Sequence, residues 1–219
     1  PDYVDDYKTA DEILDEELQT VSSARIWYVA DAMRRGWSDE ALFKQTGIDP
    51  WFLWQIRSLV KEERLIMKTK LMEISAIELR NWKRLGFSDK RIAELLNVGE
   101  SRIKDMRYEW NVLPVFKQVD TCAAEFESET PYYYSTYGEE NESLPTEKAK
   151  VLILGSGPNR IGQGIEFDYC CVHGAWAARE VGYETIILNC NPETVSTDYD
   201  TADRLYFEPI TFEDVMHVI

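Results

Sequence analysis

An apolar run that breaks into a glycine-rich turn constrains the fold of this chain more than any other feature. Residues 151–154 read VLIL, and the next ten residues contain four glycines before a helical pattern begins. Glycines at such a turn let backbone N–H groups approach a ligand, and the helix N-terminus behind them favours negative charge. The alternation that follows predicts a partial Rossmann-like α/β subdomain, with a strand at 150–154, a helix to about 182, a strand at 184–189, a short strand near 205–208 and a helix from 211.

The glycine spacing itself fits no common nucleotide fingerprint. Gly155, Gly157 and Gly162 give G-x-G-x-x-x-x-G instead of G-x-G-x-x-G, and Asn189-Cys190-Asn191 stands where an acidic residue would follow the second strand. The turn also lacks the Gly-Lys-Ser/Thr ending of a P-loop. On this pattern alone, a ligand-binding loop and a turn needed only for packing remain equally open.

The preceding region, from about residue 11 to 110, reads as helices and repeats itself. The tetrapeptide GWSD at 36–39 recurs as GFSD at 86–89. The apolar positions match as well: Leu42, Ile48, Leu53, Ile56 and Val60 in the first copy correspond to Ile92, Val98, Ile103, Met106 and Trp110 in the second. We therefore expect two copies of one helical unit, each with a core-facing apolar stripe.

In each copy the sequence predicts the end of one helix and the start of the next. A helix should end at Gly36 or Gly86, the next aromatic should fold back on the core, and Ser38 or Ser88 should cap the helix that follows. In the first copy Asp49-Pro50 predicts a further helix start, and Gly99-Glu100-Ser101 does so less strongly in the second.

After residue 111 the pattern becomes extended, at 115–120, and then rich in tyrosine. Tyr132, Tyr133, Tyr134 and Tyr137 predict an arm packed on a neighbouring surface. We therefore expect a helical domain with this arm at 1–137, a polar linker at 138–148 and a truncated α/β subdomain at 149–219. The strands that would complete its sheet should lie outside the chain.

Composition narrows the functional classes. The chain has 219 residues, 44% of them hydrophobic, and a formal net charge of −16, which argues against nucleic acid or an anionic membrane as a partner. It shows no span of about twenty apolar residues and no signal sequence, so we expect a cytoplasmic protein, and its first residue, Pro1, suggests that residues precede it. The four cysteines form no C-x-x-C pair, which predicts buried free thiols and no metal site.

Two other functional classes fit parts of the sequence. Residues 88–110 have the cadence of a helix-turn-helix with Arg102, Lys104 and Arg107 on the second helix. The acidity of the chain opposes this hypothesis, as do Trp51, Trp82 and Trp110, which predict buried helix packing. The second class is a nucleotide-binding Rossmann module built on the glycine-rich turn.

Longer motifs carry a resemblance to a known family. Residues 155–173 (GSGPNRIGQGIEFDYCCVH) and 189–200 (NCNPETVSTDYD) resemble the start of the second synthetase half of carbamoyl-phosphate synthetase large subunits. The segments RIWYVADA at 25–32, WFL at 51–53 and VDTCAAEF at 119–126 resemble the oligomerisation domain that precedes that half in the family.

The resemblance implies a ligase of the ATP-grasp type. Such a subunit makes carbamoyl phosphate for arginine and pyrimidine biosynthesis, with ATP and Mg or Mn, ammonia from a glutaminase small subunit, and other large subunits as partners. It also implies that this fragment holds no catalytic residue, binds no cofactor and is inactive alone, because the ATP site of the second half lies further on.

The resemblance further implies a carbamate passage walled by Gly164, Glu166 and Glu193. Glycine leaves the bore open, and carboxylates can hydrogen-bond a passing acid. Simpler roles fit some of the same segment: Glu166 and Asp168 fall in the first helical turn, where acids complement the helix dipole. For His173 and His217 the pattern predicts ordinary packing or surface roles.

Overall fold

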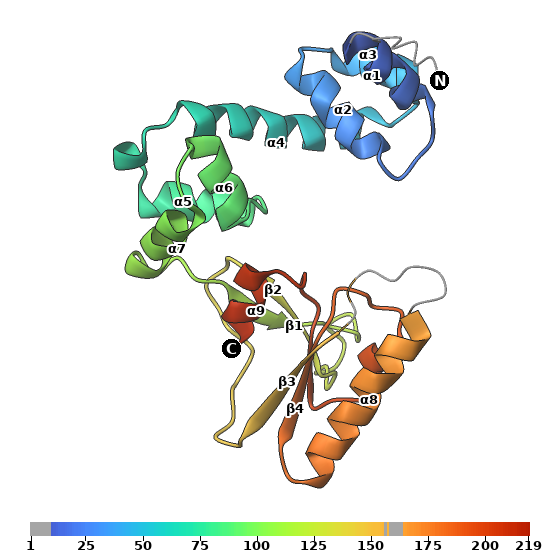
Figure 1. Cartoon of the computed structure of the whole chain (residues 1–219), viewed down its shortest axis with the longest axis vertical. Helices are drawn as coiled ribbons and strands as arrows, with labels where there is room; N and C mark the ends of the chain where they lie inside the picture. The colour runs from blue at the N-terminus through green and yellow to red at the C-terminus, as the bar shows by residue number, and fades with distance from the viewer. Residues whose placement is uncertain (1–9, 156, 158–163) are drawn as a thin grey trace, which may run out of the picture. The chain divides into compact units, whose positions relative to one another are not determined.

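The computed structural model describes residues 10–155, 157 and 164–219 (Figure 1). Within them the chain divides into two compact units, one formed by residues 10–74 and 92–98 and the other by residues 75–91 and 99–219. The helix α6 (Asp89–Leu96) therefore has residues in both units. The predicted domain boundaries at 137 and 149 stay a prediction.

The first unit is built mainly from four helices and a short 3-10 turn. They are α1 (Ala10–Gln19), α2 (Arg25–Arg34), α3 (Asp39–Thr46), α4 (Pro50–Lys68) and η1 (Leu71–Glu73). Apolar residues spaced along one face of each of the four helices bury a common core, which contains Leu14, Leu18, Val29, Met33, Leu42, Leu53 and Val60. In the second unit lie α5 (Ala76–Arg84) and α7 (Glu100–Glu109).

The turns predicted from the repeat are present in both copies. Gly36 and Gly86 adopt left-handed φ angles of 94° and 90°, which end the helices before them. The aromatic residue that follows each glycine donates its N–H to the carbonyl five residues earlier in the chain, Trp37 to Ala32 O and Phe87 to Trp82 O. These hydrogen bonds are those of a Schellman motif, so the punctuation of the repeat is confirmed.

The helix starts of the repeat are also confirmed. Ser38 Oγ accepts from Ala41 N and Ser88 Oγ accepts from Arg91 N, each at 3.1 Å. Asp49 caps α4 by accepting from Trp51 N at 2.8 Å, with Pro50 as the first helical residue. The corresponding Gly99 provides no side-chain cap for α7, as its sequence suggested.

The second unit contains a five-stranded mixed sheet. Its strands are β1 (Val115–Gln118), β2 (Tyr132–Thr136), β3 (Lys150–Leu154), β4 (Glu184–Leu188) and β5 (Arg204–Tyr206), in the order β1-β2-β5-β4-β3. All neighbours are parallel except β1 and β2, which pair antiparallel. The fold class is therefore the predicted one, helical units followed by a partial α/β subdomain.

Helices cover both faces of this sheet (Figure 1). The helix α8 (Gly164–Glu180) packs Ala175 against Ile187 and Leu205 on one face. The helix α9 (Phe212–Val218) packs Val215 and Val218 on the other face, against Ile186, Leu188, Tyr206 and Phe116. Along β4, Ile186 and Leu188 therefore face α9, whereas Ile187 between them faces α8. Parallel strands need such cover on both faces, and every residue of β4, including the apolar run Ile186–Leu188, is buried.

The tyrosine-rich segment has a role that differs from the expectation of a sheet completed outside the chain. Two further strands of the sheet lie within the chain: β2 belongs to the tyrosine-rich segment and pairs with β5 through Tyr132 and Tyr133, and β1 pairs with the other edge of β2. The polar segment after β2 also packs: Asn141 accepts from Phe116 N at 2.9 Å, and Ser143 hydrogen-bonds Tyr206 Oη at 2.7 Å. Periodicity could not place these contacts, since both partners lie far away in sequence.

Two sequence expectations need correction. The four cysteines are free, but none is buried: Cys170 is exposed and Cys122, Cys171 and Cys190 are partly exposed. Trp51, expected in the helix packing, is 60% exposed, whereas Trp82 is buried as expected. In the part of the chain that the structure describes, no helix combines the length and apolar character needed to cross a membrane.

Candidate functional site

The glycine-rich turn leaves β3 at the carboxyl edge of the parallel strands, where open α/β sheets bind ligands. The Gly155 N–H donates to Leu188 O at 2.8 Å, which ties the turn to the end of β4. A Cβ added at Gly155 would lie only 2.5 Å from Asn189 Cγ. Gly155 is therefore needed for packing against the asparagine that follows β4.

The structure describes only some of the other predicted turn residues. Gly157 adopts a left-handed φ of 74°, which favours glycine, and Gly164 is the first residue of α8. Gly162 and the side chain of Glu166 lie outside the described residues. The structure therefore supports a packing role for Gly155 and a conformational role for Gly157.

A buried carboxylate holds the next loop against α8. Asp168 is fully buried and accepts hydrogen bonds from Ser196 N at 2.9 Å, from Ser196 Oγ at 2.7 Å and from Thr194 Oγ1. Three donors satisfy a carboxylate that burial would otherwise destabilise. Asp168 is the fifth residue of α8, so its expected place in the first helical turn is wrong, and its partners are loop groups.

Short polar side chains shape the loop that carries Glu193. Asn189 is fully buried and its Nδ2 lies 3.4 Å from Ser196 Oγ. The Glu193 N–H donates to Asn191 Oδ1 at 3.0 Å, and the Glu193 side chain is exposed. Because Asp168 binds Thr194, the residue next to Glu193, the loop is held beside the N-terminal half of α8.

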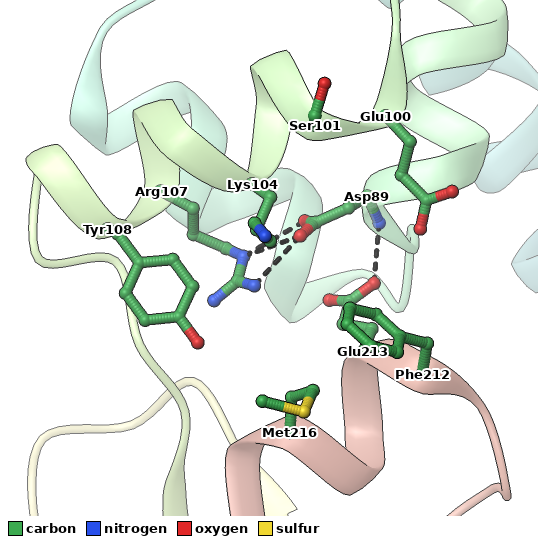
Figure 2. A pocket seen from close by; sticks show the side chains of 9 residues that line it. All are labelled: Asp89, Glu100, Ser101, Lys104, Arg107, Tyr108, Phe212, Glu213 and Met216. Carbon is green, nitrogen blue, oxygen red and sulfur yellow. Dashed lines mark hydrogen bonds and ion pairs between the residues drawn. The ribbon is translucent and has the colours of Figure 1, made fainter.

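A second cluster of polar groups joins α5, α6, α7 and α9. Figure 2 shows three of its side chains, Asp89, Arg107 and Glu213. Asp89 is 1% exposed and receives Arg107 through Nε at 3.0 Å and Nη2 at 2.9 Å, and Lys83 Nζ at 3.1 Å. Glu213 of α9 accepts from Asp89 N at 2.7 Å and pairs with Lys83. We call Lys83, Asp89, Arg107 and Glu213 the ion cluster.

The ion cluster sets the electrostatics of its surroundings. Burial opposes the charge on Arg107, but the hydrogen bonds that Arg107 donates to Asp89 and the negative charge of that carboxylate outweigh burial and raise the pKa of Arg107. Burial and the two nearby cations lower the pKa of His217 to about 4. Among the described residues, Tyr137 Oη and His217 Nε2 are buried without a hydrogen-bond partner.

A cavity of about 340 Å³ adjoins the ion cluster. Figure 2 shows its lining residues: Asp89, Glu100, Ser101, Lys104, Arg107, Tyr108, Phe212, Glu213 and Met216. Arg107 is 1% exposed, so this member of the hypothetical DNA-reading set cannot reach a phosphate. The geometry therefore opposes the helix-turn-helix hypothesis.

Sequence reasoning missed the ion cluster as a unit. In the sequence, Asp89 directly follows the expected cap Ser88, and acidic residues are common in a first helical turn. Its partner Glu213 lies 124 residues further along the chain. No local pattern links two such residues, so only the fold could bring them together.

Two known protein families match this chain, each over a different part of it. A family described as the oligomerisation domain of the carbamoyl-phosphate synthetase large chain matches residues 2–111. A family described as the carbamoyl phosphate synthase preATP-grasp domain matches residues 147–219.

Several known proteins match nearly the whole of this chain and are identical to it at more than half of the aligned residues. The carbamoyl phosphate synthase large chain of Pseudomonas aeruginosa is 59% identical over 96% of this chain and 20% of its own length. That of Vibrio cholerae is 58% identical over 93% of this chain and 19% of its own length, and that of Neisseria meningitidis serogroup B has the same values. The chain thus spans about a fifth of the length of the curated relatives it matches.

Proposed function

This chain belongs to the family of carbamoyl-phosphate synthetase large chains, and we propose that it is the part of such a subunit where the oligomerisation domain meets the second synthetase half. The observation that carries the proposal is the order of the two family matches along one chain. The whole subunit would be a ligase that makes carbamoyl phosphate from bicarbonate and glutamine-derived ammonia at the expense of ATP, for arginine and pyrimidine biosynthesis. A cytoplasmic location is part of the same proposal.

Within that enzyme, the edge of the sheet near Glu193 would form part of the wall of a carbamate passage. Gly164, Glu166 and Glu193 are the wall residues that we propose. The support is the contact between Asp168 and Ser196, which holds the loop carrying Glu193 to the helix that begins at Gly164. Carboxylates at such a place can hydrogen-bond a passing acid while protein groups exclude water.

The test is Gly164→Phe in the full-length synthetase. A bulky side chain in the bore should lower overall synthesis of carbamoyl phosphate at least about tenfold, which corresponds to about 1.4 kcal/mol in the barrier. The partial reactions of the two halves should persist. Gly174→Phe, on the same helix, tests whether any bulky residue on α8 has this effect. Unchanged synthesis in Gly164→Phe would refute the passage.

ATP with Mg or Mn would serve the full-length enzyme, not this fragment. Among the described residues, no three His, Cys, Asp or Glu side chains lie close enough together to hold a metal ion. We propose that the fragment has no turnover alone. ATP-dependent phosphate release by the purified fragment, measured above a buffer control, would contradict this.

The proposed protein partners are a glutaminase small subunit and other large subunits. The first unit supports the second of these, because several of its largest apolar side chains face solvent. Trp27, Trp51, Phe52 and Trp54 are between 56% and 70% exposed. Aromatic residues of this kind are enriched where subunits meet.

A further inference from the structure

We call residues 207–213, which lead from β5 into the first two residues of α9, the connection; it contacts three different parts of the second unit. At its start, the Phe207 N–H donates to Tyr133 O at 2.8 Å, and buried Glu208 accepts from Ser135 Oγ at 2.9 Å. At its end, Glu213 enters the ion cluster beside Asp89 (Figure 2). The connection is thus attached both to the sheet and to the helices of the second repeat.

The middle of the connection lies beside Gly157. A methyl group placed on Gly157 would be 3.6 Å from Ile210 Cδ1, an ordinary van der Waals separation. Ile210 is three residues before Glu213 in sequence. A few residues of chain therefore join the ion cluster to the turn that leaves β3.

Holding α9 through the buried charges of the ion cluster costs free energy. Lys83, Asp89 and Arg107 are each no more than 5% exposed, and removing charges from water costs several kcal/mol per ion. Apolar side chains of similar size often give equal or greater stability at such a place. An ion cluster instead fixes the relative orientation of the helices that supply its groups. Both carboxylate oxygens of Asp89 accept from Arg107, while the Asp89 N–H donates to Glu213.

We propose that Glu213 is a positioning residue: through the connection 207–213 and Ile210, it makes the position of Gly157 depend on the second helical repeat. Glu213 holds the C-terminal end of the connection against Lys83 and the Asp89 N–H. Ile210 then limits where the turn at Gly157 can lie. The consequence for carbamate transfer rests on the proposed passage, whereas the physical coupling does not.

Amide hydrogen exchange on the 219-residue chain tests the coupling directly. Three amides are read by NMR: Asp89, which donates to Glu213; Gly155, which donates to Leu188 O; and Ile187, inside the sheet, as the reporter of global folding. Glu213→Ala should accelerate exchange at Asp89 and Gly155 by about fivefold or more while Ile187 changes less than about twofold. The control Glu109→Ala, exposed on α7, should change none of them.

A second variant breaks the connection at its other contact. Ile210→Ala should accelerate Gly155 and leave Asp89 unchanged, because the ion cluster stays intact. Acceleration at Asp89 alone in Glu213→Ala, or at neither amide, would overturn the proposal. If Glu213→Ala also accelerates exchange at Ile187, the whole fold has been destabilised, and the result from Ile210→Ala decides. Faster exchange at Gly155 in Ile210→Ala supports the proposal, and unchanged exchange there overturns it.

The full-length synthetase separates this proposal from the proposed passage. Glu213→Ala should lower overall synthesis at least about threefold while the partial reactions persist, and Glu213→Gln, which keeps a hydrogen-bond acceptor, should recover part of the loss. Unchanged exchange in the fragment overturns the positioning role whatever the activity. Altered exchange with unchanged synthesis leaves the positioning role and counts against the passage.

Discussion

Gly155 shows how little room the end of β3 leaves for a side chain. Its N–H is bonded to Leu188 O, so the backbone cannot retreat from β4 without losing that hydrogen bond. Any Cβ would meet Asn189, whose side chain is itself fully buried. The site is therefore sensitive to one methyl group.

We expect Gly155→Ala to lower the free energy of unfolding by about 2 kcal/mol, because overpacking forces buried groups apart. Gly174→Ala is the matched control in the second unit. A Cβ there would lie 3.7 Å from Ile153 Cδ1, and alanine favours the helix by about 1 kcal/mol. Urea unfolding measures both variants, and equal effects would contradict the packing role of Gly155.

His217 predicts a dependence of stability on pH. Its pKa is lowered from 6.5 to about 4 by burial and by Arg107 and Lys83, so the unfolded chain binds a proton more readily than the folded one. The free energy of unfolding should therefore fall as the pH drops from about 6.5 toward 4. Because the ring is only partly buried, we expect a loss of about 2 kcal/mol from this group.

The test compares unfolding at pH 7 and pH 5 in His217→Gln and in the wild type. The wild type should lose more stability than the variant over this interval, because glutamine does not titrate. His173→Gln, an exposed position on α8, should behave as the wild type. Equal losses in wild type and His217→Gln would show that His217 does not titrate as expected.

At the scale of elements, the two copies of the helical unit share their turns more closely than their surroundings. Gly36 and Gly86 have nearly the same left-handed φ, and no atom lies within 4 Å of a Cβ built on either. Their partners differ, because the acidic residue after the cap is Asp39 in one copy and the buried Asp89 in the other. The same local sequence thus serves a partly exposed ion pair in one place and the ion cluster in the other.

We expect Gly36→Ala and Gly86→Ala to lower the free energy of unfolding of their units by similar amounts, about 1 kcal/mol each. The cost is conformational, since L residues avoid this region of φ and no clash is added. Gly36→Asn and Gly86→Asn should cost less, because asparagine tolerates the left-handed conformation. Thermal unfolding of the four variants is the measurement, and a loss only in one copy would contradict a shared conformational cause.

At the scale of the whole molecule, the exposed aromatic residues of the first unit predict self-association. The side chains of Trp51 and Trp54 lie one helical turn apart on α4 and are 60% and 59% exposed. Trp51→Ser and Trp54→Ser should weaken association at least about tenfold in Kd, or about 1.4 kcal/mol. Tyr169→Ser, an exposed aromatic on α8, is the control. Sedimentation across a concentration series measures it, and a monomer at every concentration would contradict the prediction.

Much of the fold could be predicted from local sequence, and the physical reason is that helix ends and strands depend on nearby residues. Glycine at a left-handed turn, serine at an N-cap and an apolar run such as 151–154 act within a few residues of themselves. Gly155 and Gly157 after β3, the loop after β4 and the turns of the repeat therefore lie where the local sequence predicts them. The family resemblance came from the same continuous stretches.

What local sequence could not supply is the set of contacts between distant segments. The pairing of β2 with β5, the bonds from Asp168 to Ser196 and the ion cluster joining Asp89 to Glu213 exist only in the folded chain. Their residue types are ordinary polar or aromatic ones that periodicity assigns to caps, arms or surfaces. Packing decided which of them are buried, because a charge or strand edge removed from water must meet a complementary group wherever the fold provides one.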